Sequence, residues 1–183
     1  MSADRGATAR AMRAAASALL AGLAPDVRGR VALPFSHDQR RWMEYRPRPR
    51  AGVTLGELDP ASRKNAHRLL ATALSPPAYA QAMAIVALEE VLDRAENWRR
   101  GRHSNDYAVV MFADPAGDAP WAWRFEGHHL SLTMTLDGDA VAPTPVFLGA
   151  NPARIDHGGQ AVLRPLAPEE DLARALLDEM GPA

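Results

Sequence analysis

The sequence predicts an α+β fold, with an antiparallel β meander packed against several α-helices. Helix signals dominate residues 54–100, extended segments and turn signals dominate residues 106–149, and a last helix is expected over 167–180. Runs of helices and strands that do not alternate are typical of this class. The chain has 183 residues, of which 47% are hydrophobic and 23% charged. We therefore expect a single domain over 1–183 with a core of its own.

An amphipathic N-terminal helix is predicted over residues 7–23, because Met12, Ala16, Leu19 and Leu23 recur at helical spacing. A short export signal is the alternative interpretation, since arginines precede this apolar stretch. The regular apolar face favours the helix, and with it a cytoplasmic protein. No apolar stretch in the sequence is long enough to span a bilayer.

Two helices are predicted in the helical part, over 60–74 and from 76 to about 99. Asp59-Pro60 and Ser75-Pro76 each place a capping side chain before a proline at the first helical position. The second of these helices carries apolar residues on two faces, which is typical of a helix buried between layers. The last helix begins with acidic residues, as the helix dipole favours.

The apolar pattern changes parity at Gly127. Residues 121, 123 and 125 are apolar before it, and residues 130, 132, 134 and 136 are apolar after it. Strand side chains alternate with period two, so one regular strand cannot bury both sets on one face. A β-bulge at Gly127 would restore the alternation, and a hairpin turn at Gly127 is the alternative.

Imidazole and carboxylate groups gather around Gly127. We expect a metal site formed by Glu126, His128 and His129, with His37 or, as the alternative, His103 arriving from elsewhere in the fold. Divalent iron, zinc or copper suits such nitrogen and oxygen ligands. A simpler interpretation is favoured on spacing alone: Glu126 forms a surface ion pair and His128 is a hydrogen-bonded core residue.

A catalytic interpretation assigns further roles around the same stretch. Glu126 and His129 would transfer protons, and Arg124 would position an anionic substrate. Asn151 would donate a hydrogen bond to that substrate, and Trp123 would contact it.

Several cofactors and partners are not expected. The absence of cysteine excludes disulfides and all-cysteine iron–sulfur clusters. Lys64, the only lysine, lies in a polar helical stretch, which speaks against pyridoxal chemistry, and no glycine-rich loop indicates a nucleotide. A net charge of −1 gives no general attraction to nucleic acid. The arginines and aromatic residues of 40–50 could bind a single strand, but a loop packed on the domain is the better interpretation.

The stretches Trp121 to Leu132 and Thr144 to Ala153 resemble an uncharacterised family, domain of unknown function three thousand five hundred. Softer similarity extends this resemblance from about Phe35 to Leu177. The family supplies no established reaction. The resemblance implies that longer members continue to a second histidine motif, His-Ile-His, so that this chain would be a short form.

Two functions are therefore expected for a member of this uncharacterised family. The first is a metal-dependent enzyme, or its remnant, acting on a small anionic substrate. The alternative is a non-catalytic module that binds a ligand or a protein and assembles with itself or with a partner chain.

Overall fold

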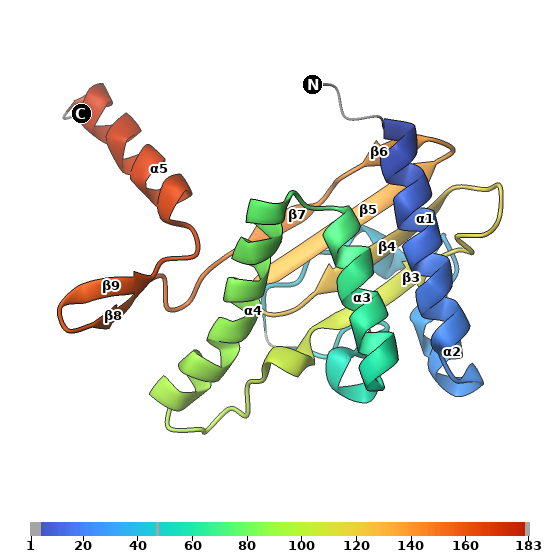
Figure 1. The fold of residues 1–183 in the computed structure, drawn as a ribbon, viewed down its shortest axis with the longest axis horizontal. Coiled ribbons are helices and arrows are strands. Elements are labelled where there is room, and N and C mark those ends of the chain that lie inside the picture. The colour runs from blue at the N-terminus through green and yellow to red at the C-terminus, as the bar shows by residue number, and fades with distance from the viewer. Residues whose placement is uncertain (1–4, 47, 182–183) are drawn as a thin grey trace.

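The α+β prediction is confirmed by a computed structural model that describes residues 5–46 and 48–181. Figure 1 shows helices packed on one side of a mainly antiparallel sheet and a last helix that lies apart from it. The helices of the described residues are α1 (Arg5–Gly22), α2 (Pro25–Val31), α3 (Pro60–Thr72), α4 (Pro76–Ala95) and α5 (Ala167–Met180). None of these helices is both long and apolar enough to cross a membrane.

The two predicted helix caps are present. The Asp59 carboxylate accepts hydrogen bonds from the amides of Ala61 and Ser62 at 2.8 and 2.9 Å, and the Ser75 hydroxyl accepts one from Ala78 at 3.4 Å. These oxygens satisfy amides that lack a partner within the first helical turn. Helix α4 ends at Ala95, earlier than predicted, and the left-handed residues Asn97 and Trp98 follow it.

The main sheet has the strand order β1-β3-β4-β5-β6, with β2 paired to β3 and β7 paired to β5. Only β1 runs parallel to its neighbour. The strands are β1 (Ala32–Leu33), β2 (Val53–Thr54), β3 (Ala108–Phe112), β4 (Trp121–Glu126), β5 (Leu130–Asp137), β6 (Ala140–Ala142) and β7 (Val146–Leu148). Three short 3₁₀ helices, η1 (Asp38–Arg41), η2 (Leu55–Glu57) and η3 (Ser104–Asp106), complete the body.

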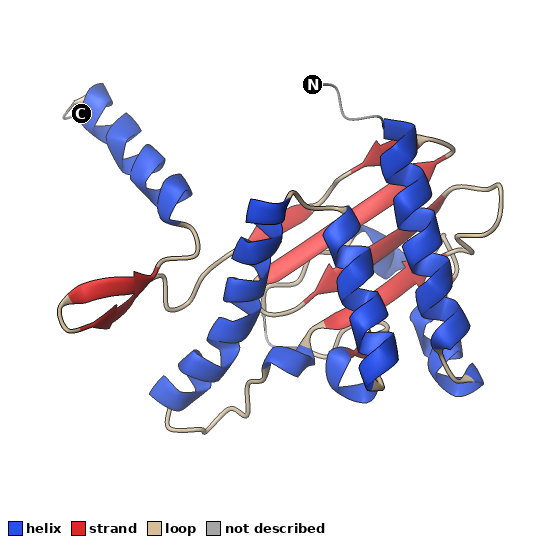
Figure 2. Ribbon diagram, viewed as in Figure 1, coloured by secondary structure: helices blue, strands red, loops and turns tan. Residues whose placement is uncertain are grey.

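The two faces of the sheet are covered differently. Helices α1, α3 and α4 cover one face, as Figure 2 shows, and the apolar side chains of β4 and β5 pack beneath them. Residues 35–46 and 48–51, which we call the strap, cross the opposite face without regular strands. The Arg124 guanidinium on that face donates to the carbonyl oxygens of Gln39 and Trp42 at 2.5 and 2.9 Å. The described part of this loop, 40–46 and 48–50, therefore packs on the domain, as predicted.

The C-terminal part lies to one side of this body (Figure 1). It consists of the hairpin β8 (Ile155–His157) and β9 (Gln160–Leu163) followed by α5. Leu166 packs against the main core, and Glu169 accepts a hydrogen bond from Gln81 of α4 at 3.0 Å. The prediction that 1–183 form one domain stays a prediction.

The prediction of a β-bulge at Gly127 is wrong. The alternative prediction, a hairpin turn at this residue, is confirmed. Glu126 pairs with Ser131, and the Gly127 amide donates to the Leu130 carbonyl oxygen at 2.7 Å, so His128 and His129 form the turn. In this antiparallel register Phe125 lies opposite Leu132. Odd positions of β4 and even positions of β5 therefore share a face, which accounts for the change of parity without an inserted residue.

Gly127 is required by a close approach rather than by backbone conformation. A Cβ atom at this position would overlap the ring of Tyr107, which is itself buried against the sheet. The Tyr107 ring also stacks on Phe125, with 5.7 Å between ring centroids. The ring has no room to move away, so the turn and the core are fitted to each other at this position.

We expect Gly127→Ala to lower the free energy of unfolding by about 1–3 kcal/mol, because the added methyl group overpacks a filled site. Urea unfolding followed by circular dichroism measures this change. Gly29→Ala in α2 is the matched control, because its Cβ would meet nothing within 4 Å. It should raise stability by about 0.5–1 kcal/mol. Equal stability of Gly127→Ala and the wild type would contradict the close-approach argument.

Candidate metal centre

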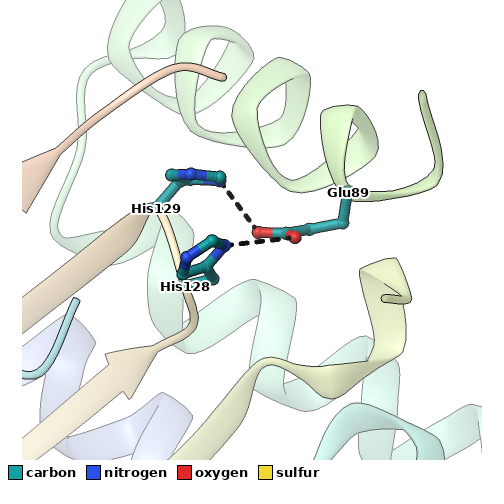
Figure 3. Close-up of side chains that lie close together, drawn as sticks. All are labelled: Glu89, His128 and His129. Atoms are coloured by element: carbon teal, nitrogen blue, oxygen red, sulfur yellow. Dashed lines mark hydrogen bonds and ion pairs between the residues drawn. The ribbon is translucent and has the colours of Figure 1, made fainter. Parts of the chain in front are cut away.

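Three side chains from two elements converge at the β4–β5 turn. Glu89 projects from α4, and His128 and His129 are the two turn residues below it, as Figure 3 shows. The imidazole rings lie 3.9 Å apart between centroids and are tilted by 42°. Neighbouring side chains of an extended strand point to opposite faces, but a turn can direct both to one side. The hairpin is therefore what lets two adjacent histidines face one carboxylate.

The spacing of the donor atoms suits one metal ion. The Nδ1 atom of His129 lies 3.1 Å from Glu89 Oε1, and the Nδ1 atom of His128 lies 3.7 Å from Glu89 Oε2. All three residues can offer ligand atoms within 4.8 Å of one another. Two ligands that each lie about 2.1 Å from a tetrahedral ion are about 3.4 Å apart. Only small adjustments of the three side chains would be needed to reach that geometry.

Burial and a second hydrogen bond hold the carboxylate in place. Glu89 is 3% exposed, and the Tyr107 hydroxyl donates to its Oε1 atom at 3.3 Å. Tyr107 is the residue whose ring requires Gly127. A hydrogen bond of this kind orients a ligand and is a regular feature of metal sites in proteins.

The local charges favour forms of these side chains that can donate lone pairs. Burial alone would raise the pKa of Glu89, but the hydrogen bond with His129 and the neighbouring positive charge, that of Arg102 included, hold that pKa below its usual value. Burial, followed by the charge of His129, lowers the pKa of His128. An ionised carboxylate beside a neutral imidazole is the state that metal binding requires.

Arg102 is the nearest cation to these ligands. Its Nη1 atom contacts His128 Nδ1 and lies 3.3 Å from His128 Nε2 and 3.9 Å from Glu89 Oε2. Its Nε atom donates to Glu96 Oε2 at 3.1 Å. Arg102 thus offsets the buried charge of Glu89 and contacts a ligand atom of His128.

A pocket of about 320 Å³ adjoins two of the three side chains, Glu89 and His128. Glu89, Tyr107 and His128 form part of its wall, and much of the remainder is cationic. The arginines that line it are Arg48, Arg50, Arg100 and Arg102. A pocket of this size accommodates a small molecule, and its charge suits an anion.

Glu126 lies outside the cluster, on the strap side of the sheet. It is 2% exposed and accepts a hydrogen bond from Ser131 Oγ at 2.8 Å and one from the Glu44 amide at 3.1 Å. Its Oε2 atom is 3.5 Å from Arg124 Nε and 3.6 Å from Arg50 Nε. The expected ion pair with Arg124 therefore exists, but it is buried rather than on the surface.

The other predicted site residues are also separated from the cluster. Arg124 is 1% exposed and binds strap carbonyls, and Trp123 is fully buried beneath the helices, so neither can reach a solute. The His37 side chain accepts from the Gln39 amide at 3.2 Å and lies near Phe112. Asn151 is exposed in the loop after β7. Of the predicted metal ligands, the structure brings together only His128 and His129.

Glu89 is the member of the cluster that the sequence analysis missed. The sequence does contain a signal for this residue: Glu89 is an acidic residue among the apolar positions of α4, where Ile85, Leu88 and Leu92 are buried. A carboxylate is rarely placed in such a stripe unless it has a partner. That partner comes from a turn about 40 residues further along the chain, which helical spacing cannot reveal.

The fold and the site define an α+β protein with a cluster of one carboxylate and two imidazoles, of which Glu89 and His128 line an arginine-rich pocket. The chain belongs to the family described as protein of unknown function (DUF3500), whose model matches residues 5–183. Neither the curated proteins nor the solved structures contain a match to it.

The lowered pKa of His128 makes stability depend on pH in a definite direction. The unfolded chain takes up a proton near pH 6.5, whereas folded His128 resists it, so the free energy of unfolding should fall as pH drops below about 6.5. His67 contributes with the same sign, because burial lowers its pKa too. Urea titrations of chelator-treated protein between pH 7.5 and about 5.5 measure the slope.

His128→Gln should make this slope shallower, and His67→Gln combined with it should flatten the slope further. The two variants remove separate groups, so their effects should add. A slope in His128→Gln equal to that of the wild type would show that His128 is not a source of the pH dependence.

Proposed function

We propose that Glu89, His128 and His129 form a divalent-metal centre, and that the protein is a metal-dependent enzyme acting on a small anionic substrate. The observation that carries this proposal is the convergence of the three donors, at 3.1 and 3.7 Å, beside a pocket of about 320 Å³. Surface acids often lie together without a ligand, but these three side chains are mostly buried.

The donor set favours a catalytic site over a structural one. Structural zinc sites are closed by four protein ligands, whereas catalytic sites keep three and leave a position for water or substrate. Two imidazoles and one carboxylate suit iron, zinc or copper. When bound, such an ion supplies Lewis acidity and lowers the pKa of bound water.

Residues of the chain would orient the carboxylate ligand, exclude water from one side of the cluster and attract the anionic substrate. Tyr107 holds the Glu89 oxygen by its hydroxyl hydrogen bond and keeps the carboxylate facing the turn. The wall formed by α4 and the β4–β5 turn keeps bulk water from the inner side of the cluster, where Glu89 is buried. Arginines on the open side would draw an anion into the pocket.

Zinc added to chelator-treated protein should bind at one equivalent, with the affinity lowered at least 10- to 100-fold in Glu89→Gln, His128→Gln or His129→Gln. Isothermal titration calorimetry measures both quantities, and Co²⁺ absorption reports the coordination geometry. Glu90→Gln is the matched control, because Glu90 is the next residue of α4 and instead accepts from Ser104.

Glu126→Gln separates the observed cluster from the ligand set expected from the sequence. This substitution should leave zinc stoichiometry and affinity within about twofold of the wild type. Absence of zinc, iron and copper binding in the wild-type protein would overturn the proposed metal centre.

A second candidate function, assembly with another copy of the chain, is favoured by the exposed apolar face of α5. Four large side chains of this helix are each more than 60% exposed: Leu172, Leu176, Leu177 and Met180. Exposed apolar stripes of this kind usually mark interaction surfaces. The polar residues of α5 comprise five acids and one arginine, so the helix presents a negative amphipathic surface.

A surface of complementary character lies on the strap. Trp42 and Tyr45 are 54% and 61% exposed, and the exposed arginines Arg41, Arg46 and Arg48 are interspersed with them. An acidic, leucine-bearing helix and a basic, aromatic strap would satisfy each other in a reciprocal pair of chains. We therefore propose that α5 of one chain binds the strap of a second copy of the chain.

Light scattering during gel filtration should show a dimer of the wild-type chain at high micromolar concentration. The double substitution of Leu172→Ser with Leu176→Ser should shift it to monomer, and Trp42→Ser should do the same from the opposite surface. Gln160→Ser, at an exposed position of β9 that belongs to neither surface, serves as control. A monomeric wild type under these conditions would remove this candidate.

A further inference from the structure

We propose that Arg102 is the residue that recognises the anionic group of the ligand, and that it becomes available for this when a metal ion takes His128. The inference rests on the proposed metal centre and adds to it the substrate class and the residue that selects it. The ligand class is a small molecule with a carboxylate or phosphate group.

Two of the four arginines in the pocket wall, Arg50 and Arg100, are engaged elsewhere. The Nη2 atom of Arg50 donates to the carbonyl oxygens of Glu44, Arg46 and Gly127, and its Nε atom faces Glu126. Arg50 therefore ties the strap to the hairpin and has little capacity for a ligand. Arg100 is largely exposed and pairs with Glu96.

Arg102 differs because its guanidinium contacts a ligand atom of the cluster. The side chain is 9% exposed, and its Nη1 atom contacts His128 Nδ1. A guanidinium can only donate, so it uses the imidazole lone pair on that nitrogen. A metal ion at the same nitrogen needs the same lone pair and repels the positive charge beside it.

Metal binding and the present position of Arg102 therefore exclude each other. The hydrogen bond from Arg102 Nε to Glu96 remains possible after displacement and keeps the guanidinium at the pocket wall. There it would present its planar fork, which matches the paired oxygens of carboxylate and phosphate. The anionic group would lie on Arg102, with the rest of the ligand beside the cluster.

This arrangement couples two binding events. The metal ion releases Arg102 for the anion, and the anion holds Arg102 away from His128. Each ligand should then raise the affinity of the other by the same factor, because such coupling is reciprocal.

The test uses the full chain and two probes, acetate for the carboxylate class and methylphosphonate for the phosphate class. Calorimetry gives the affinity of each probe for chelator-treated and zinc-loaded protein. Zinc should raise the affinity of at least one probe by about 10-fold in the wild type, within the usual range of coupling between two sites. The probe that gains more identifies the class.

Arg102→Gln should bind zinc about 10-fold more tightly than the wild type in the absence of anions, because the competing guanidinium is gone. In this variant, zinc should no longer raise the affinity for either probe. Arg102→Lys keeps the charge but not the fork, so zinc affinity should stay near that of the wild type while most of the gain disappears. Arg99→Gln, at an exposed arginine that is not among the residues lining the pocket, should behave as the wild type.

The outcomes separate this inference from the metal centre itself. The role of Arg102 would be overturned if Arg102→Gln bound zinc with wild-type affinity. It would also be overturned if zinc still raised the affinity of Arg102→Gln for a probe. Either result would leave the proposed metal centre intact. Zinc binding to neither the wild type nor Arg102→Gln would overturn the metal centre, and the inference with it. Thermal unfolding of each variant confirms that the compared proteins are folded.

Discussion

The contact between Gly127 and the Tyr107 ring is the constraint on which the rest of the site depends. It allows β4 to turn into β5 directly over a buried aromatic residue, and the turn then consists of the two histidines. The same tyrosine donates its hydroxyl hydrogen to Glu89, so one side chain fixes the turn on one side and the carboxylate on the other. The geometry of the cluster is therefore set by core packing, which resists small displacements.

The sheet divides the ionisable residues of the hairpin into two groups with different surroundings. Glu126, Arg124 and Arg50 lie towards the strap, where Glu126 forms ion pairs with both arginines and the arginines donate hydrogen bonds to strap carbonyls. Buried charges of this kind are paired because a lone charge there would be costly. His128 and His129 face α4 instead, where Arg102 and the pocket leave room for a ligand. Residues adjacent in sequence thus serve structure on one face and candidate chemistry on the other.

Local patterns predicted the helices and strands well, because caps and period-two alternation act over a few residues. The parity change at Gly127 held the information for the hairpin, since a turn and a bulge both alter the alternation, and only the pairing of Glu126 with Ser131 separates them. The histidines were predicted as ligands from their residue type. Glu89 and Arg102 could not be joined to them, because their proximity depends on how α4 and the segment after it pack on the sheet. The prediction placed Arg124 and Glu126 at the site because they are close to the histidines in the sequence. In the structure the side chains of both residues point to the strap side of the sheet, away from the cluster.

Two of the three side chains of the cluster are consecutive residues, and the third belongs to a different element. A single peptide unit fixes the separation of their Cα atoms, and the turn between β4 and β5 sets the side on which both imidazoles lie. The distance from Glu89 to that pair has no covalent basis, since it follows the position of α4 over the sheet. A rigid-body displacement of this helix would open or tighten the triad while leaving the histidine pair unchanged. The packing of α4 on the sheet therefore sets how closely Glu89 approaches the two imidazoles.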